Sequence, residues 1–482
     1  MLDRISYTDT FFNELNPHAI RCIAAMRGFD IPDSHSFTYC ELGCGTGHSL
    51  IVFAAANPQA QFIGIDFNEE HIAHAKQRAE SLGILNCTFL NADITTLQEL
   101  PSCDYIVMHG LYTWVHQSVR DAIHHIIERS LSHNGLVLVS YNAYPGWHLY
   151  EPLRMMFREY SMGLSEDPFA NAEQGLGFLR WMLDQHAEYM NAIPSSASFI
   201  EELTKHDRRY IIHEYYADHW TPLWFKDMDE HMSRSGLSFA GQIPMFLNNG
   251  SIALSEEFHE ILSIEGDIKR FETFKDLIRN TMFRWDIYAM KSSEQSTFES
   301  MHIGIVQTNI DFSEQVQLPN CKPIALDMEF HAPIMKAMMN QASTLNEIIE
   351  YCTALDLTRP HVESAIHNLL MTEQIKPIPG NISAIESTTQ FKQYVLGFLE
   401  EALIAEEHVI PSIFSGSGIY INKDTALMLL ACIKHADEPI QWIAEWMEVH
   451  GYGDYSDVYD KAKRAYQEFE QTIPFWQRMQ IM

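Results

Sequence analysis

Residues 41–47 read Glu-Leu-Gly-Cys-Gly-Thr-Gly, and this glycine-rich stretch joins an apolar segment to a helical one. The apolar residues 38–43 predict a short buried strand, and the sequence after the glycines predicts a helix that ends at residue 56, before Asn57-Pro58. Glycine allows a tight turn and lets backbone N–H groups come close to a ligand. The N-terminus of a helix favours a carboxylate or a phosphate. The turn therefore predicts a ligand site between a strand and a helix.

The same alternation of strand and helix continues to residue 142. Further strands are expected over residues 61–66, 87–93, 103–110 and 136–142, and helices over residues 69–82 and 117–132. Helical connections of this length imply parallel strands, so the sequence predicts a doubly wound α/β sheet. Ligands of such sheets bind beyond the carboxyl ends of the strands.

Two carboxylates follow strands of this sheet. Asp66 ends the second strand, where a carboxylate can accept both hydroxyls of a ribose, and Asp93 ends the third, where it can accept from an adenine amino group. A dinucleotide-binding loop would read GxGxxG, whereas residues 43–47 read GxGxG with an acidic residue two positions earlier. A lone GxGxG is often only a tight turn. Together with the two carboxylates, it predicts nucleoside binding.

The chain is strongly acidic. Its 482 residues include 64 Asp and Glu against 32 Lys and Arg, a formal net charge of −32. A protein that binds duplex DNA needs a basic surface, because neutralising phosphates supplies most of its affinity, so nucleic acid is not an expected partner. An acidic surface favours cationic partners or serves solubility. The length predicts about three domains.

Cysteine and histidine usage gives no sign of a disulfide framework or a metal site. The eight cysteines are scattered, Cys40 and Cys44 have no second pair near them, and the 24 histidines include no HExxH motif, so we expect no bound metal. The N-terminus lacks the apolar core of a signal peptide, and the longest apolar run, residues 426–433, is too short to span a membrane. The sequence thus predicts a cytoplasmic protein without a membrane span.

Several motifs resemble those of known methyltransferases. ELGCGTG at 41–47, GID at 64–66 and NADI at 91–94 look like those of class I S-adenosylmethionine-dependent methyltransferases. HGLYTWV at 109–115, VRDAI at 119–123, SYNAYPGWH at 140–148 and the lead-in at 6–17 resemble bacterial methyltransferases with a methyltransferase regulatory domain. That group includes protein lysine methyltransferases that act on outer-membrane proteins. The resemblance implies a seven-stranded Rossmann-like sheet, S-adenosylmethionine as the cofactor and methyltransferase activity.

The resemblance also assigns residues to the cofactor. The glycine-rich loop would hold its methionyl part, Asp66 its ribose hydroxyls, and Asp93 with Ile94 its adenine. The full set of expected cofactor-binding residues is Glu41, Gly43, Cys44, Gly45, Gly47, Asp66, Phe67, Asp93, Ile94, His109 and Gly110.

Aromatic residues follow the fourth and fifth strands, where class I enzymes place groups that face the substrate. We expect the catalytic side of the site to consist of His109, Tyr112, Trp114, Tyr141 and Asn142. Aromatic faces attract cations and can guide a lysine side chain. The alternative is that Tyr112 and Trp114 only cap the core of the sheet. His109 is either a base or hydrogen-bonding group for the acceptor, or a buried histidine without a catalytic role.

Two substitutions would test the assignment of residues to the cofactor and to the acceptor. Asp66→Ala is expected to abolish cofactor binding, and Tyr112→Ala is expected to spare binding but remove turnover. The chain lacks the Asn/Asp-Pro-Pro-Tyr/Phe motif of enzymes that methylate amino groups of nucleic-acid bases. That absence and the acidic charge both argue against a nucleic-acid base as the acceptor.

Residues 147–208 read as an insertion after the fifth strand. Their patterns predict helices over residues 154–162 and 175–191, and their place at the carboxyl edge of the sheet suggests a lid over the acceptor. After it, residues 209–216 are expected to be extended, residues 222–235 helical, and residues 237–243 a strand that completes the sheet.

After residue 255 the sequence becomes mainly helical. We expect helical stretches over residues 271–279 and 283–290, a linker at 318–323, three short helices over 333–343, 345–352 and 360–373, and a wing strand at 375–378. This order is compatible with a winged helix. Its third helix has no lysine or arginine except Arg359 just before it, so a protein-contact or structural role is favoured over DNA binding. A boundary at 377–383 precedes a helical region with a Gly/Ser break at 415–418.

The expected domains are a methyltransferase domain (1–255), a middle region (256–322), a winged-helix-like module (323–380) and a C-terminal helical domain (381–482). The favoured function is S-adenosylmethionine-dependent methylation of lysine side chains of a protein acceptor. One alternative is methylation of an oxygen or nitrogen of a small molecule or peptide. Another is a regulatory protein that binds S-adenosylmethionine and carries a winged-helix interaction module. The oligomeric state stays open.

Overall fold

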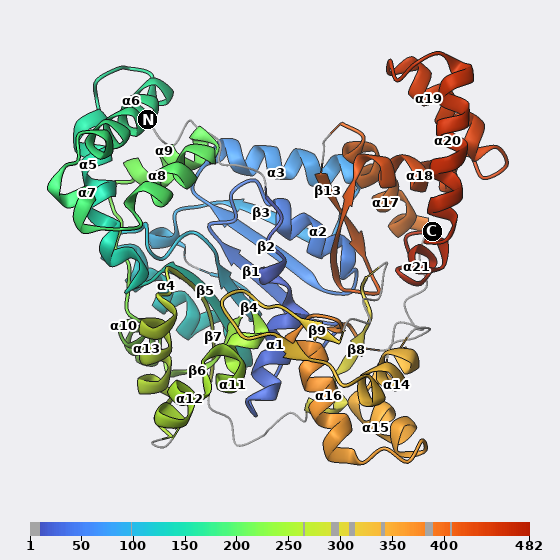
Figure 1. Ribbon diagram of the computed structural model, residues 1–482, viewed down its shortest axis with the longest axis horizontal. Helices are drawn as coiled ribbons and strands as arrows, with labels where there is room; N and C mark the ends of the chain where they lie inside the picture. The colour runs from blue at the N-terminus through green and yellow to red at the C-terminus, as the bar shows by residue number, and fades with distance from the viewer. Residues whose placement is uncertain are drawn as a thin grey trace.

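The computed structural model describes residues 10–97, 99–263, 266–290, 298–307, 314–338, 343–380, 389–404 and 407–482. Three expected segments fall partly outside these ranges: the lead-in at residues 6–9, a helix at residues 339–342 and a boundary at residues 381–383. Figure 1 shows a central sheet with a helical insertion to one side and two further modules on the other.

Seven strands form the central sheet, in the order β3-β2-β1-β4-β5-β7-β6. Their bounds are β1 Thr38–Leu42, β2 Gln61–Asp66, β3 Cys87–Asn91, β4 Cys103–Met108, β5 Leu131–Asn142, β6 Leu237–Ile243 and β7 Phe283–Met290. Strands β1 to β5 pair in parallel, whereas β7 runs antiparallel to its neighbours β5 and β6. The prediction of a seven-stranded, doubly wound sheet is confirmed.

Helices cover both faces of this sheet. One face carries α1 (Pro17–Met26), α2 (His48–Ala56) and α3 (Glu69–Leu82), and the other carries α4 (Gln117–Ser130) and α10 (Phe225–Arg234). Strand β2 and helix α3 have the predicted bounds, because short-range contacts determine them. The Asn68 side chain accepts from two N–H groups of the first turn of α3, and Gly83 ends the helix with a φ of 74°.

The insertion folds into helices with an apolar core of their own (Figure 1). Its helices are α5 (Glu151–Ser161), α6 (Pro168–Asp184), α7 (Glu188–Ala192), α8 (Ser196–Lys205) and α9 (Arg208–Tyr216). The prediction that residues 209–216 are extended is wrong. Asp207 caps α9 by accepting from the N–H of Arg209, and four residues at helical spacing from Ile211 to Tyr216 are buried in the core.

The prediction of a helical stretch at residues 283–290 is also wrong, because they form strand β7 inside the sheet. This strand lies beyond residue 255, the expected end of the first domain. The central sheet therefore includes residues up to 290. Arg284 and Asp286 of β7 are fully buried. Charged residues inside a sheet need partners, since an unpaired buried charge is very costly.

Arg284 is the centre of a buried ionic network between β7, β5 and α13, the helix Ile268–Arg279. Its guanidinium donates to Asp286 at 2.9 Å, to Asp276 at 2.7 Å and to Glu272 at 2.9 Å. Tyr141 of β5 donates to Asp286 at 2.7 Å. Burial raises the pKa of Asp286 to about 6, although the Arg284 charge opposes the rise. The network joins the antiparallel strand to the parallel part of the sheet.

The described residues between 298 and 380 form a module of three helices and small strands. Its elements are β8 (His302–Gly304), β9 (Gln315–Val316), β10 (Ile324–Ala325), α14 (Met328–Met338), β11 (Ser343–Thr344), α15 (Leu345–Thr353), α16 (Arg359–Met371) and β12 (Lys376–Pro377). The three expected helices are confirmed, and the winged-helix assignment stays a prediction. Arg359 pairs with Glu363 at 2.6 Å and with Glu299 at 2.8 Å, so carboxylates already engage this cation.

The last part of the chain combines helices with a hairpin. Its elements are α17 (Thr389–Ala402), β13 (Glu407–Ser412), β14 (Ser417–Asn422), α18 (Lys423–Lys434), α19 (Pro439–Val449), α20 (Tyr455–Glu470) and α21 (Ile473–Arg478). The hairpin differs from the prediction of a helical region. Residues 415–418, expected as a break between helices, belong to the turn of the hairpin and to the start of β14.

The hairpin packs against α2 of the sheet domain. A Cβ on Gly418 would lie 2.9 Å from Val52 of α2, and the Asn57 amide donates to the carbonyl of Gly416 at 2.9 Å. Arg78 of α3 pairs with Glu401 of α17 at 2.9 Å. The C-terminal region is thereby joined to the helices that follow the glycine turn (Figure 1).

Short elements complete the fold: η2 (Asn13–Leu15), η3 (Ile94–Thr96), η4 (Gly146–Leu149), η5 (Met245–Asn248), α11 (Gly250–Ala253), α12 (Glu256–Ser263) and η6 (Phe298–Ser300). Within the described ranges, every helix is too short or too polar to cross a membrane. All eight cysteines are free. The described residues contain no group of three His, Cys, Asp or Glu side chains placed to hold a metal ion.

Arg284→Ala is expected to destabilise the fold by about 3–5 kcal/mol, because it leaves buried carboxylates without their cation. As a control, Arg359→Ala removes only exposed ion pairs and should cost less than about 1 kcal/mol. Urea denaturation followed by circular dichroism measures both losses. Small and equal losses in the two variants would contradict a stabilising role of the network.

Candidate active site

The glycine-rich turn holds three residues in the left-handed conformation. Gly43, Gly45 and Gly47 have φ angles of 74°, 54° and 68°, which favour glycine. The N–H groups of Gly43 and Cys44 donate to the carbonyl of Ile65 at 2.8 and 3.0 Å, which fastens the turn to β2. A Cβ added at Gly45 would meet no atom within 4 Å. The turn therefore faces open space.

Close packing behind the turn also requires glycine. A Cβ on Gly47 would lie 2.4 Å from the ring of Phe89, and one on Gly64 would lie 2.7 Å from the same ring. Phe89 of β3 thus packs directly against the start of α2, where Gly47 is the N-cap residue, and against the middle of β2. The first N–H groups of α2 consequently lie at the carboxyl edge of the sheet, where they can bind an anionic group.

Asp66 ends β2, as predicted, and is nearly buried. Its Oδ2 accepts from the N–H of Gly45 at 2.9 Å, and its Oδ1 accepts from the N–H of Asn68 at 2.9 Å. Each carboxylate oxygen can accept a further hydrogen bond, so Asp66 can bind a pair of hydroxyls while it holds the turn. The neighbouring Phe67 is 67% exposed, which leaves its ring open to a flat ligand.

Glu41 lies on β1 below the turn and is buried. Burial and the charge of Asp66 raise the pKa of Glu41 to about 8. The carboxyl group is therefore protonated at neutral pH. A cation that binds close to it favours its ionised form.

Asp93 follows β3 and caps the short helix η3. Its Oδ1 accepts from the N–H and from the hydroxyl of Thr95, at 2.8 and 2.7 Å. Ile94 is half-buried against the core of the sheet face that α4 covers. Since β3 pairs with β2 in parallel, Asp93 and Asp66 lie at the same edge of the sheet.

His109 follows β4 and is surrounded by aromatic rings. Its ring stacks on Trp285 with 4.3 Å between centroids, lies 4.1 Å from Phe12 and 6.3 Å from Phe283. We call Phe12, His109, Phe283 and Trp285 the His109 cluster. All four side chains are only partly buried, so the cluster presents aromatic surface at the edge of the sheet.

Burial lowers the pKa of His109 to about 3, so its ring is neutral at physiological pH. The Ser140 hydroxyl lies 2.9 Å from Nδ1 of His109 and accepts from the N–H of Gly110 at 3.0 Å. The cluster adjoins the glycine turn, because β1 and β4 pair in parallel with Glu41 opposite Val107, and Gly43 and His109 each follow two residues later. The structure thus brings His109 and Gly110 beside the expected cofactor loop.

Two expected catalytic tyrosines lie in the core instead. Tyr112 is fully buried, with its hydroxyl 3.1 Å from Nε2 of His124 and 3.2 Å from Nδ1 of His231. Tyr141 is fully buried on the face that carries the ionic network and donates to Asp286. Neither ring faces the edge of the sheet. Loss of Tyr112 removes core packing, so its alanine variant is expected to be destabilised rather than selectively inactive.

Asn142 ends β5 on the same face as Ser140 and pairs in register with Phe283. It is 4% exposed, and its Nδ2 has no hydrogen-bond partner among the described residues. A buried donor without a partner is costly, and a bound ligand can satisfy it. Trp114 is half-buried in the turn after β4.

Three members of the His109 cluster were not among the expected site residues. Phe283 and Trp285 lie on β7, where the sequence pattern predicts a helix, and Phe12 reaches the cluster from the segment before α1. The alternation of aromatic residues 283 and 285 with charged residues 284 and 286 is the pattern that indicates one face of a strand.

Comparisons with known proteins agree with this geometry. Residues 33–266 match a family model described as a methyltransferase domain. An uncharacterized protein of Synechocystis sp. is 28% identical over 463 residues, which cover 90% of this chain and 88% of that protein. A tRNA (guanine-N(7)-)-methyltransferase of Chloroflexus aggregans is 40% identical over only 72 residues, 14% of this chain and 32% of that one.

The whole chain also resembles a solved structure, that of PKMT2 from Rickettsia typhi in complex with AdoHcy. The TM-score is 0.73 with 19% sequence identity, and the likeness covers 99% of both chains. The matched domain contains the glycine turn, Asp66, Asp93 and His109. Residues 33–266 therefore form a methyltransferase domain, and the chain shares the overall fold of that structure.

Proposed function

We propose that the protein transfers a methyl group from S-adenosylmethionine to lysine side chains of a protein acceptor, at the His109 cluster. The observation that carries the proposal is this partly exposed aromatic surface beside the glycine turn, in which the one titratable ring, His109, is neutral. The shared fold with PKMT2, a lysine methyltransferase, supports the proposal.

The residues at the carboxyl edge suit the cofactor. When bound, S-adenosylmethionine supplies an electrophilic methyl group on a sulfonium. The open side of the glycine turn and the first N–H groups of α2 would hold its methionyl part, and Asp66 would accept its ribose hydroxyls. The exposed ring of Phe67 would cover the adenine, and Asp93 would accept from its amino group. Glu41, when ionised, would offset the positive charge of the ligand.

On the acceptor side, the aromatic rings attract the lysine ammonium and then take its stem out of water. A lysine with a pKa of about 10.4 must lose its proton before it can attack. His109, with a pKa of about 3, is too weak a base for that task. Desolvation by the cluster lowers the lysine pKa, so the proton leaves to water. The aromatic rings of the cluster then hold the neutral amine, whose lone pair attacks the methyl group while the sulfonium becomes a thioether.

The charge of the chain suits a lysine-bearing partner. A net charge of −32 raises the association rate of cationic surfaces, and this rate falls as salt screens the charges. The four side chains of the His109 cluster include no carboxylate that would hold the lysine in its charged form.

Mass spectrometry tests the proposed function directly. The purified protein is incubated with isotope-labelled S-adenosylmethionine and a panel of unfolded outer-membrane proteins, and lysine peptides are examined for labelled methyl groups. Labelled mono-, di- or trimethyllysine is expected with the wild type and not with Asp66→Ala. Labelled oxygen atoms or small molecules without labelled lysine would replace the proposal by the small-molecule alternative. Cofactor binding without any transfer would favour the regulatory alternative.

Asp66→Ala is expected to weaken S-adenosylmethionine binding at least about a hundredfold, because two hydroxyls lose a charged acceptor. The turn also loses its tie from Gly45. Isothermal titration calorimetry measures the affinity. Asp93→Ala, which changes an exposed carboxylate at the next strand, is the control and should have a smaller effect. Unchanged affinity in Asp66→Ala would show that the ribose assignment is wrong.

Cofactor binding is expected to release protons below pH 8. Glu41 is protonated in the free protein up to about pH 8, and a bound cation favours its ionised form, so its pKa falls on binding. Affinity should therefore rise with pH and level off above pH 8. Calorimetry in buffers of different ionisation enthalpy measures the protons released, and Glu41→Gln should abolish this release. Equal proton release by the wild type and Glu41→Gln would contradict the role of Glu41.

Trp285→Leu is expected to lower kcat/KM for lysine transfer about tenfold, since a cation–π contact contributes about 1–2 kcal/mol. Its affinity for S-adenosylmethionine should not change. Trp442→Leu is the matched control, because Trp442 is a half-buried ring of α19 that stacks on His435, outside the sheet domain. Equal kcat/KM values for the two variants would rule out the cluster as the lysine site.

A further inference from the structure

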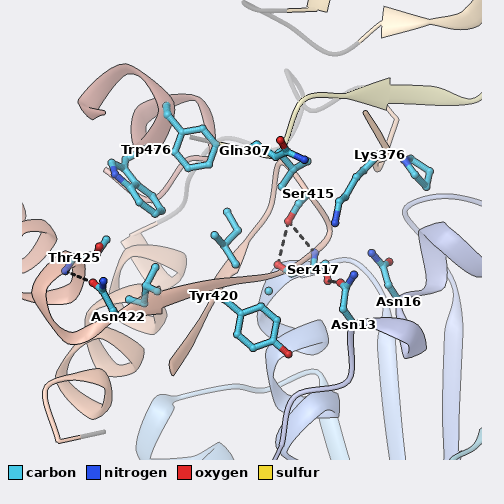
Figure 2. A pocket seen from close by; sticks show the side chains of 16 residues that line it. Asn13, Asn16, Gln307, Lys376, Ser415, Ser417, Tyr420, Asn422, Thr425 and Trp476 are labelled. Atoms are coloured by element: carbon cyan, nitrogen blue, oxygen red, sulfur yellow. Dashed lines mark hydrogen bonds between the residues drawn. The ribbon is translucent and has the colours of Figure 1, made fainter. Parts of the chain in front are cut away.

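A pocket of about 540 Å³ lies where three parts of the chain meet (Figure 2). One wall is the segment before α1, with Asn13. A second is the small sheet of the three-helix module, with Gln307 and Lys376, and the third is strand β14 with α21, which contributes Trp476. No residue of the glycine turn or of the His109 cluster lines this pocket.

The pocket runs along an edge of β14. Every residue of this strand lines it, and neighbouring side chains of a strand point to opposite faces, so the pocket borders the strand from its edge. The other edge of β14 pairs with β13. Pro411 of β13 stands opposite Gly418 and has no N–H. The peptide groups of Gly418 therefore point away from β13, toward the pocket.

The lining is polar but almost uncharged. It contains amide and hydroxyl side chains, and its one charged side chain, Lys376, pairs with Glu373 at 3.1 Å. Phe475 and Trp476 add apolar wall. Amides, hydroxyls and a strand edge are partners for peptide groups, and aromatic rings are partners for apolar side chains. This chemistry suits an uncharged, extended peptide.

The pocket shares a wall with the His109 cluster. The Tyr420 hydroxyl donates to the carbonyl of Phe11 at 2.6 Å, and the Ser417 hydroxyl donates to Oδ1 of Asn13 at 2.9 Å. Phe12, between these two residues, packs on the ring of His109. The segment of residues 11–13 thus lies between the pocket and the His109 cluster.

We propose that this pocket holds an extended segment of the acceptor protein, which adds to β14 as a further strand while a lysine of the same acceptor lies at the His109 cluster. This inference rests on the proposed transfer to protein lysine. Main-chain pairing gives affinity with little dependence on side chains, so one pocket can serve several acceptor segments. The six residues of β14 offer about 20 Å of strand edge.

Fluorescence anisotropy with the full chain tests the pocket. The probes are labelled, uncharged, lysine-free ten-residue peptides with valine, threonine or tyrosine at alternate positions, and the same peptides N-methylated on alternate backbone amides. We expect saturable binding of the unmodified peptides. N-methylation should weaken it at least about tenfold, because two or more main-chain hydrogen bonds are lost. No saturable binding, or equal binding of the N-methylated peptides, would overturn the proposal.

Substitutions locate the binding. Ile419→Glu places a charge in the pocket, and Gln307→Trp fills it from the opposite wall, so each should weaken peptide binding at least about tenfold. Unchanged affinity for S-adenosylmethionine shows that a variant is folded. Val449→Glu is the control, since Val449 is 80% exposed on α19 and does not line the pocket. Equal peptide binding by all three variants would overturn the proposal.

Methylation of the same peptides, extended by one lysine, separates this inference from the proposed function. Lysine methylation with equal kcat/KM in the wild type and Ile419→Glu would overturn the pocket and leave the proposed function standing. Peptide binding at the pocket without methylation of any lysine would overturn the proposed function. The pocket would then bind peptides for a purpose other than methyl transfer.

Discussion

The rest of the structure depends on the close contact between the ring of Phe89 and two glycines, Gly47 and Gly64. Because neither glycine has a Cβ, α2 can begin directly behind β1, with its first N–H groups at the carboxyl edge. Helix α2 then supports distant parts of the chain. Its Ser49 accepts from the N–H of Phe12 at 3.0 Å, which places the Phe12 ring on His109, and its other surface carries the hairpin of the C-terminal region. A contact at one turn therefore determines the walls of both the cofactor site and the acceptor site.

The two faces of strand β7 have different roles, one in the stability of the fold and the other in the proposed lysine site. Arg284 and Asp286 face the buried ionic network, while Phe283 and Trp285 face His109 on the other side of the sheet. The same burial sets the charges at the site, because it keeps the His109 ring neutral and holds a proton on Glu41. An acidic protein thus keeps two titratable groups of this site, His109 and Glu41, uncharged until a cationic ligand arrives. This arrangement reconciles a net charge of −32 with an amine acceptor that must itself become neutral.

The parallel half of the sheet could be predicted because its determinants are local. Strand β2, helix α3 and the positions of Asp66 and Asp93 follow from glycines, caps and apolar runs within a few residues. The antiparallel half could not, since the charges of β7 are buried through partners that the local pattern does not reveal. Asp276 lies on the preceding helix α13, and Tyr141 lies on β5, 145 residues from Asp286. For the same reason the sequence does not show that the rings of Tyr112 and Tyr141 lie in the core. Tyr112 follows β4 and Tyr141 lies within β5, but the face to which each ring points depends on core partners such as His124 and Asp286.

A crystal structure of the protein with AdoHcy and a lysine-containing acceptor peptide tests the central claim most directly. The account predicts that the AdoHcy sulfur faces the His109 cluster, that Asp66 accepts from the ribose hydroxyls, and that the lysine nitrogen lies against Trp285 and Phe283. A sulfur that faces away from these rings, or a lysine held against other residues such as Trp114, would contradict it.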